Sequence, residues 1–213
     1  MTKYWENMSN VFLDFDGTLV NSQGRLYRLF CRLCPECNMS YDEYWQIKCG
    51  RISQSTMLKK YFGYDDGRIQ KFHKEWLDHI EDEEAVDTDF PVAGMSERLE
   101  CMARKHELYL LTARQRSELV VRQVERFGWS GHFRKLIVTR QACGKSDAVR
   151  ELIGSVKSGV LIGDTGEDIK AAKALGFRSI AVGWGILSPK VLVEYKPDYL
   201  AERIEDLDNC PFI

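Results

Sequence analysis

The sequence lacks both an excess of charge of one sign and a long apolar run. Its 213 residues carry 30 basic and 32 acidic side chains, a formal net charge of −2. Without a basic block, nothing in the chain favours nucleic acid or an anionic membrane surface as a partner. No segment approaches the roughly 18 consecutive apolar residues of a membrane span, and the N-terminal residues contain no apolar signal segment. We therefore expect a cytoplasmic protein that binds a small molecule, with its oligomeric state left open.

Histidine is also scarce, and the four histidines show no metal-ligand spacing. The seven cysteines are an odd number without the pattern of a disulfide scaffold, which favours a reducing compartment. Cys31, Cys34 and Cys37 have a spacing typical of metal-ligand runs, but a fourth ligand is missing and Pro35 interrupts the segment. The sequence favours ordinary thiols here and leaves any further role open.

The order of expected elements indicates a domain with an insertion. Residues 11–15 form a short apolar strand, yet the next convincing parallel strand is at residues 108–111, far beyond the usual connection of about 2 to 6 residues. Apolar residues at helical spacing fill much of the interval. They predict helices over residues 25–33, 41–47, 53–62 and 68–80. The acidic stretch 81–84 is interpreted as a solvated helix end in the returning linker.

After the insertion, strands and helices alternate steadily. The pattern predicts helices at 96–105, 117–127, 146–153, 167–175 and 190–195, and strands at 108–111, 136–138, 159–162, 178–182 and 198–200. This alternation is typical of a mostly parallel sheet with helices on both faces. We therefore predict an α/β fold: a Rossmann-like, doubly wound core of residues 1–20 and 90–213, with a smaller all-helical cap domain, residues 21–89, inserted into it.

Two carboxylates, Asp14 and Asp16, end the first apolar strand. A strand buried on both faces has no structural use for them, since an unpaired buried carboxylate is costly. Open α/β sheets place their ligand crevice at the carboxyl ends of parallel strands. There the two groups can supply a nucleophile, a proton-transfer group and a cation site.

Other polar residues recur at the same predicted edge. Thr112 follows a strand, Asp164 follows another, and Lys145 stands before a helix that enters the crevice. Asp168 lies one helical turn beyond Asp164, where it also suits a helix N-terminus as a purely structural residue. Taken singly, each has an ordinary structural explanation, such as a cap or a solvated side chain. Together they predict a charged pocket.

The chain resembles the haloacid dehalogenase superfamily, in its phosphatase branch, through four motifs in order. The matching segments are Asp14-Phe15-Asp16-Gly17-Thr18-Leu19-Val20, Leu111-Thr112-Ala113-Arg114, Lys145, and Gly163-Asp164-Thr165-Gly166-Glu167-Asp168. The helical insertion after the first motif matches the cap of members such as phosphoglycolate phosphatase and β-phosphoglucomutase. The resemblance implies a Mg²⁺-dependent phosphomonoesterase that acts on a small phosphate ester, of the phosphoglycolate, sugar phosphate or nucleotide type.

The resemblance also implies a role for each motif residue. Asp14 attacks phosphorus and forms an aspartyl phosphate, and Asp16 protonates the leaving group and then activates water. The hydroxyl of Thr112, the amide of Ala113 and the side chain of Lys145 hold the phosphate. The metal set is Asp14, Asp16 through its carbonyl, Asp164 and Asp168, with Mg²⁺ favoured by the oxygen ligands. For Asp168, direct ligation, ligation through water and orientation of Lys145 all stay open.

Substrate choice is expected to depend on the cap, which closes over the crevice. Arg51 occupies roughly the place of a substrate-contacting cap loop, and Arg114 adjoins Thr112; either can grip an anionic leaving group or lie at the surface. A phosphomutase built on the same core residues is the nearest alternative activity. An inactive phosphate-ligand sensor is the alternative outside enzymes.

Overall fold

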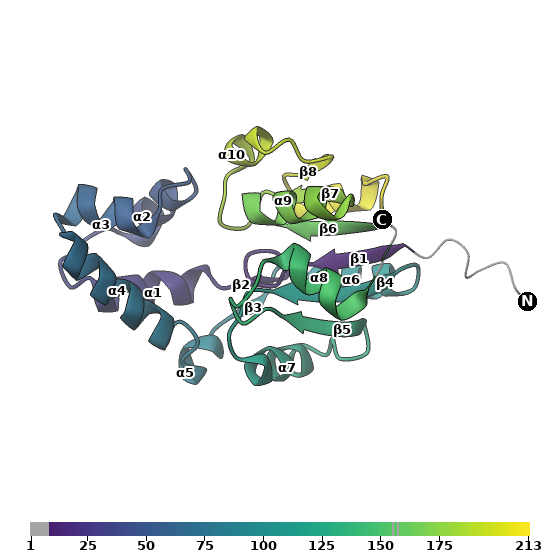
Figure 1. Ribbon diagram of the computed structural model, residues 1–213, viewed down its shortest axis with the longest axis horizontal. Helices are drawn as coiled ribbons and strands as arrows, with labels where there is room; N and C mark the ends of the chain where they lie inside the picture. Colours follow the sequence, from purple (N-terminus) through teal and green to yellow (C-terminus); the bar gives the residue numbers. More distant parts are fainter. Residues whose placement is uncertain (1–8, 155, 157) are drawn as a thin grey trace, which may run out of the picture.

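The computed structural model describes residues 9–154, 156 and 158–213. Its centre is a six-stranded sheet in which all neighbouring strands are parallel, in the order β5-β4-β1-β6-β7-β8 (Figure 1). The strands are β1 (Asn10–Leu13), β4 (Glu107–Thr112), β5 (Phe133–Val138), β6 (Gly159–Gly163), β7 (Arg178–Val182) and β8 (Tyr199–Ala201). The predicted α/β fold class is confirmed, and β1 lies between β4 and β6, near the middle of the sheet.

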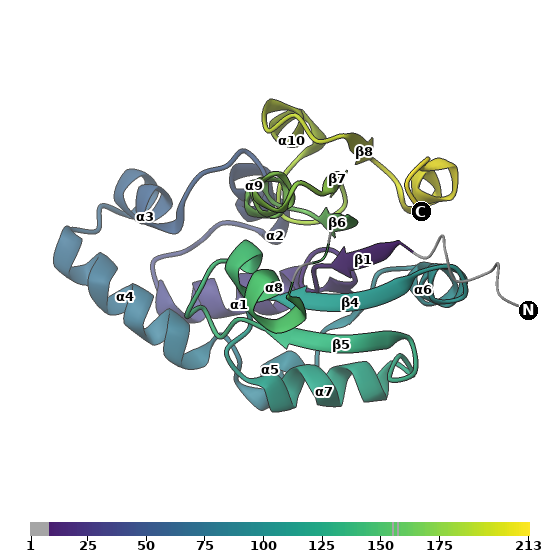
Figure 2. The ribbon, with the colours of Figure 1, turned by 45° about the vertical axis from the view of Figure 1, so that its right-hand side comes forward.

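Alternate residues along the central strands enter two separate apolar layers. Val11 and Leu13 belong to one cluster of buried side chains, while Phe12 belongs to another. The first layer includes α6 (Met95–Ala103), α7 (Ser117–Arg126) and the 3-10 helix η1 (Ile204–Asn209). The second includes α8 (Lys145–Ile153) and α9 (Gly166–Leu175), and α10 (Pro189–Glu194) packs beside α9. Helices therefore cover both faces, as in a doubly wound fold (Figure 2).

A helical segment interrupts the core between two short strands, β2 (Val20–Asn21) and β3 (Phe90–Pro91), which pair antiparallel. It comprises α1 (Gln23–Leu33), α2 (Tyr41–Lys48), α3 (Gln54–Phe62), α4 (Asp66–His79) and α5 (Glu83–Val86). Its own apolar centre contains Phe30, Tyr44 and Met57. In Figure 1, α1 to α4 lie beyond the end of the sheet at which β2 and β3 are found.

The helical segment touches the core on the side of α10 as well as at β2 and β3. Ile186, from the loop after β7, packs against the apolar centre of the segment, and Ser188 N–H donates to Cys49 O at 3.1 Å. The expected division at residues 20/21 and 89/90 falls within β2 and just before β3, and we keep it as a proposal. Residues 1–8 of the expected core lie outside the described residues.

Several short elements were not predicted, and some boundaries differ. β2, β3, α5 and η1 span only two to six residues each, too few to show a period. β1 ends at Leu13 instead of residue 15, because the chain turns at Phe15, whose carbonyl accepts the N–H groups of Leu19 and Val20. Within the described part of the chain, no helix combines the length and apolar composition needed to cross a bilayer.

Candidate active site

Three predicted site residues stand at the carboxyl ends of adjacent strands. Asp14 follows β1, Thr112 ends β4, and Asp164 follows β6. The register pairs Leu13 with Leu110 and with Ile162, so these strand ends meet at one edge of the sheet. They line a cavity of about 210 Å³, together with the predicted residues Asp16, Ala113, Arg114 and Lys145.

An acidic cluster includes two of the residues that line this cavity, Asp14 and Asp164. Carboxylate oxygens of Asp14, Asp164 and Asp168 all lie within 4.8 Å of one another, and all three residues are buried. Lys145, the first residue of α8, places its Nζ 2.6 Å from Asp14 Oδ1 and 2.5 Å from Asp168 Oδ1. Asp168 Oδ2 also accepts hydrogen bonds from the backbone N–H and the hydroxyl of Thr165, the N-cap residue of α9. The geometry thus uses both oxygens of Asp168 to fix Lys145 and the start of α9.

The acidic cluster is electrostatically crowded. Burial, with a smaller contribution from the charge of Asp168, raises the pKa of Asp14 to about 7 in spite of the opposing effect of Lys145. Burial, followed by the charges of Asp14 and Asp168, also raises the pKa of Asp164 well above its ordinary value. For Lys145, burial alone would lower the pKa, but the two neighbouring carboxylates outweigh it and keep the ammonium protonated. One lysine does not balance three carboxylates.

The donor set fits a hard divalent cation. Oδ2 of Asp164 accepts the backbone N–H of Ile186 at 2.7 Å, whereas its Oδ1 is buried without a hydrogen-bond partner among the described residues. A buried carboxylate oxygen without a donor is costly, and an oxygen-only ligand set is the one that Mg²⁺ prefers. Gly17 and Gly185 enclose this side chain so closely that a Cβ on either would lie 2.1 to 2.3 Å from Asp164 atoms.

Asp16 has different surroundings, although it lies only two residues from Asp14. Arg114 donates two hydrogen bonds to Asp16, from Nε to Oδ2 at 2.5 Å and from Nη2 to Oδ1 at 2.7 Å. Arg25, from α1, adds a third through Nη2 at 2.7 Å. Burial alone would raise the pKa of Asp16, but Arg114 and Arg25 outweigh it and hold the pKa well below its usual value. Asp16 is therefore ionised in this arrangement.

The loop after β4 is fixed from the helical segment. Thr112 Oγ1 accepts the backbone N–H of Arg114 at 3.3 Å. Glu81, just beyond α4, accepts the N–H groups of Gln115 at 2.6 Å and Arg116 at 2.9 Å. The carboxylate thus satisfies two backbone donors at the start of α7, a position that favours negative charge. Only 6% of Glu81 is exposed, so the interpretation of this stretch as solvated was wrong for this residue.

Sequence reasoning missed three charged residues at the site: Arg25, Glu81 and Asp89. Each belongs to the helical segment or its return, and its partners at the site lie 9 to 64 residues away along the chain. The only sequence signal was the acidic stretch that contains Glu81. Arg51 was expected either to contact the substrate or to lie at the surface, and it is not among the residues that line the 210 Å³ cavity. Its guanidinium lies over the Tyr195 ring at 4.8 Å and 3.7 Å from Glu194 Oε2.

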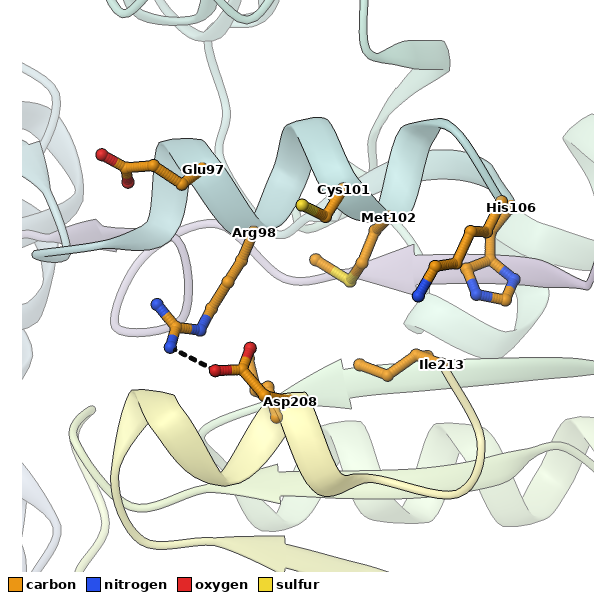
Figure 3. A pocket seen from close by; sticks show the side chains of 9 residues that line it. Glu97, Arg98, Cys101, Met102, His106, Asp208 and Ile213 are labelled. Atoms are coloured by element: carbon orange, nitrogen blue, oxygen red, sulfur yellow. Dashed lines mark hydrogen bonds and ion pairs between the residues drawn. The ribbon is translucent and has the colours of Figure 1, made fainter.

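A second cavity, of about 280 Å³, lies elsewhere, between α6 and the C-terminal residues (Figure 3). Arg98 and Asp208 form an ion pair of 2.7 Å across it, and Cys101 and His106 also contribute to its lining. None of the predicted site residues lines this cavity. It therefore takes no part in the arrangement described above.

The cysteine run does not form a metal site among the residues that the structure describes. Cys31 and Cys37 have their Sγ atoms 3.8 Å apart, and Cys34 is fully buried. All three are free thiols, and burial raises the pKa of Cys37 to about 11, which disfavours the thiolate that metals require. In the described chain, the acidic cluster alone groups three metal-ligating side chains.

Comparisons with known proteins agree with the fold. A family model described as haloacid dehalogenase-like hydrolase matches residues 11–182. The “Putative pyrophosphatase PpaX” of Caldanaerobacter subterraneus is 26% identical over 220 residues, which cover 92% of this chain and 91% of that protein. A haloacid dehalogenase-like family hydrolase of Streptococcus pneumoniae superposes with a TM-score of 0.77 at 19% identity, covering 95% of this chain and 98% of that one.

The magnesium-bound “putative HAD-hydrolase YfnB” of Bacillus subtilis superposes with a TM-score of 0.62 at 14% identity. The match covers 96% of this chain and 98% of that one. At such identities, a structural likeness establishes the arrangement of helices and strands and leaves the reaction to be argued from the site.

Proposed function

The chain belongs to the haloacid dehalogenase-like hydrolase family, and we propose that it is a Mg²⁺-dependent phosphatase that hydrolyses a small phosphate monoester through an aspartyl phosphate on Asp14. The observation that carries the proposal is the 210 Å³ cavity, which Asp14, Thr112 and Lys145 all line. Support for the metal comes from the acidic cluster and from the magnesium-bound YfnB, and support for phosphoryl chemistry from the name of the PpaX relative.

In the first step, a carboxylate oxygen of Asp14 forms a bond to phosphorus while the bond from phosphorus to the leaving oxygen breaks, and the leaving oxygen takes a proton from Asp16. Lys145 lies 2.6 Å from Asp14 and offsets negative charge on the nucleophile and the transferring group. The hydroxyl of Thr112 and the amide of Ala113, both at the cavity, donate hydrogen bonds to the phosphate oxygens. The product is an aspartyl phosphate, a mixed anhydride between phosphate and the Asp14 carboxyl group.

Asp14, Asp164 and the backbone carbonyl of Asp16 would hold the metal, while Asp168 fixes Lys145. When bound, Mg²⁺ supplies the positive charge that keeps the crowded carboxylates ionised and offsets the charge of the phosphate. In the second step, a water oxygen bonds to phosphorus, the bond to Asp14 breaks, and Asp16 takes the proton from water. The ionised Asp16 of this structure is the form that accepts a proton.

The cavity favours a small substrate. Its volume of about 210 Å³ is below the roughly 300 Å³ at which pockets for drug-sized ligands begin, so phosphoglycolate or a short sugar phosphate suits it better than a nucleotide. A second candidate is inorganic pyrophosphate. An alkoxide needs a proton to leave, whereas a leaving phosphate does not. The two guanidiniums around Asp16 favour its ionised form, which carries no proton to donate.

The test is a phosphate-release assay, with Mg²⁺ and with EDTA, on phosphoglycolate, hexose phosphates, nucleotides and pyrophosphate. We expect turnover that requires Mg²⁺ and is lost in Asp14→Asn. Asp208→Asn, on the far cavity, is the matched control and should retain it. Transfer of phosphate to a second hydroxyl of a hexose would indicate a mutase. Binding of the esters without turnover would indicate a sensor, and full activity of a folded Asp14→Asn variant would refute the mechanism.

A further inference from the structure

Three buried charges and the partly buried Asp16 meet beside the proposed nucleophile, and they form two arginine–aspartate pairs. Arg114 holds Asp16 with two hydrogen bonds, and Arg25 holds Asp89 with two, from its Nε to Oδ1 at 3.1 Å and Oδ2 at 2.9 Å. Each pair also binds the other. Arg25 reaches Asp16 at 2.7 Å, and Arg114 Nη2 reaches Asp89 at 3.2 Å. We call these four residues the charge quartet.

Asp89 differs from the other members in its place. Arg25, Arg114 and Asp16 line the 210 Å³ cavity, whereas Asp89 stands behind the wall, immediately before β3. Its side chain is 1% exposed, and its Oδ2 is also 3.5 Å from Gln123 Nε2. Asp89 therefore touches neither the cavity nor the acidic cluster, yet it contacts both guanidiniums that hold Asp16.

The charges of the quartet balance only with Asp89 in place. Two buried guanidiniums beside Asp16 alone would leave one cation without a counterion, and uncompensated buried charge is strongly unfavourable. With Asp89, each guanidinium has a carboxylate of its own, and Nη2 of Arg25 is left to bind Asp16 as well. Two N–H groups of Arg114 bind Asp16 and fix the plane of that guanidinium, while the single Nε–H of Arg25 is shared between both carboxylate oxygens of Asp89.

We propose that Asp89 is a positioning residue for the proton transfer of the hydrolytic reaction, acting on Asp16 through Arg25 and Arg114. The inference rests on the proposed function, in which a water oxygen bonds to phosphorus, its proton passes to Asp16 and the bond to Asp14 breaks. Asp89 takes part in none of these bonds. It holds the two arginines in the orientation in which the Asp16 carboxylate faces the cavity.

A double-mutant cycle on the full-length protein with Mg²⁺ tests this assignment. Asp89→Asn leaves one surplus positive charge and Arg25→Met one surplus negative charge, whereas the double variant leaves the Arg114–Asp16 pair balanced. We expect kcat to fall at least about tenfold in each single variant, with KM changed less than about threefold because the phosphate contacts remain. The double variant should have a higher kcat than either single variant. Additive effects would instead give it the lowest kcat, so this result would show that the two sites are coupled.

The matched control is Asp87→Asn. Asp87 lies two residues before Asp89, and its exposed carboxylate pairs with Arg122 and Arg126. The variant should keep kcat within about twofold. Melting temperatures are measured for every variant. A purely structural role predicts lower melting temperatures, an unchanged kcat per folded molecule, and a double variant that is less active than either single variant. An unchanged kcat, or a double variant with lower kcat than both single variants, overturns the assignment.

If Asp89→Asn does not fold, the comparison between Arg25→Met and the double variant decides. A double variant that is no more active than Arg25→Met refutes the role of charge balance. The wild-type assay separates this failure from failure of the proposed function. When the wild type releases phosphate and the cycle is additive, only the role of Asp89 falls; when the wild type releases none from any ester with Mg²⁺, both proposals fall.

Discussion

The acidic cluster should make the stability of the metal-free protein fall as pH rises, and Mg²⁺ should reverse this fall. Asp14 has an ordinary pKa of 3.8, which burial raises to about 7 in the folded chain. Between these two values, the folded state binds a proton that the unfolded state has released. Stability falls with pH wherever the folded state binds more protons, so the contribution of Asp14 decreases from about pH 4 to pH 7.

The size of the effect follows from the same two pKa values. A rise from 3.8 to about 7 corresponds to roughly 4 kcal/mol of folding free energy, present at low pH and lost above pH 7. Asp164 adds to it in the same direction, since its pKa is also raised by burial and by Asp14 and Asp168. A cation that binds the ionised cluster in the folded state alone, at 100 times its Kd, recovers about 2.7 kcal/mol.

The assay is urea unfolding at pH 5.5, 7 and 8, each in EDTA and in excess Mg²⁺. We expect the free energy of unfolding in EDTA to decrease toward pH 8, and the stabilisation by Mg²⁺ to be largest there. Asp164→Asn should abolish most of the Mg²⁺ effect and should itself be more stable than the wild type in EDTA at pH 8. This second expectation arises because an amide can still accept the Ile186 N–H without carrying buried charge.

The reasoning would be refuted by a stabilisation by Mg²⁺ that is independent of pH or greatest at pH 5.5. It would equally fail if Asp164→Asn kept the full response to Mg²⁺. Asp208→Asn, which removes a carboxylate paired with Arg98 at the far cavity, controls for the loss of one acidic side chain and should behave as the wild type does.

Two further substitutions address how the site is held. Glu81→Gln should raise KM and lower the free energy of unfolding by about 1 to 3 kcal/mol, because one amide oxygen cannot accept both backbone N–H groups after Arg114. Steady-state kinetics and urea unfolding measure these effects, with Glu83→Gln, at a surface ion pair, as the control. Equal effects of both substitutions would contradict the role of Glu81. Gly17→Ala should abolish the Mg²⁺-dependent rise in melting temperature, because the new Cβ would lie 2.1 Å from Asp164 Oδ2. Gly128→Ala has a similar positive φ but no atom within 4 Å, so it should keep the response. Loss of the response in both variants would show that backbone strain alone is responsible, and a full response in both would refute the effect of the contact with Asp164.

The parallel strands were the predictable part of the molecule. Their ends bring Asp14, Thr112 and Asp164 together, and this follows from two facts available in the sequence: apolar runs of strand length and polar residues directly after them. Sheet geometry does the rest, since parallel strands end at a common edge. Lys145 was predictable for a related reason, because α8 begins at that edge and its first residue points to the same carboxylates.

The contribution of the helical segment to the site was not predictable in this way. Arg25 and Asp89 are separated by 64 residues, and helical periodicity says which face of α1 is buried but not which charge is buried with it. A buried arginine is tolerated only with a partner, and that partner is fixed by how the segment returns through β3. Arg51, chosen for its place in the sequence, lies instead against Tyr195 beside α10.

Asp14 and Asp16 show why the strand-end motif alone underdetermines the chemistry. The sequence presents two identical carboxylates two residues apart, yet burial raises the pKa of Asp14, while Arg114 and Arg25 hold that of Asp16 far below its ordinary value. Environments that separate two like groups assign them different tasks. In the proposed reaction, Asp14 would need a cation to be fully ionised and to attack, whereas Asp16 is held ionised by Arg25 of the helical segment and Arg114 of the loop after β4. Cation binding and the position of the helical segment therefore control different steps of the proposed reaction: the first controls the nucleophile, and the second controls the proton.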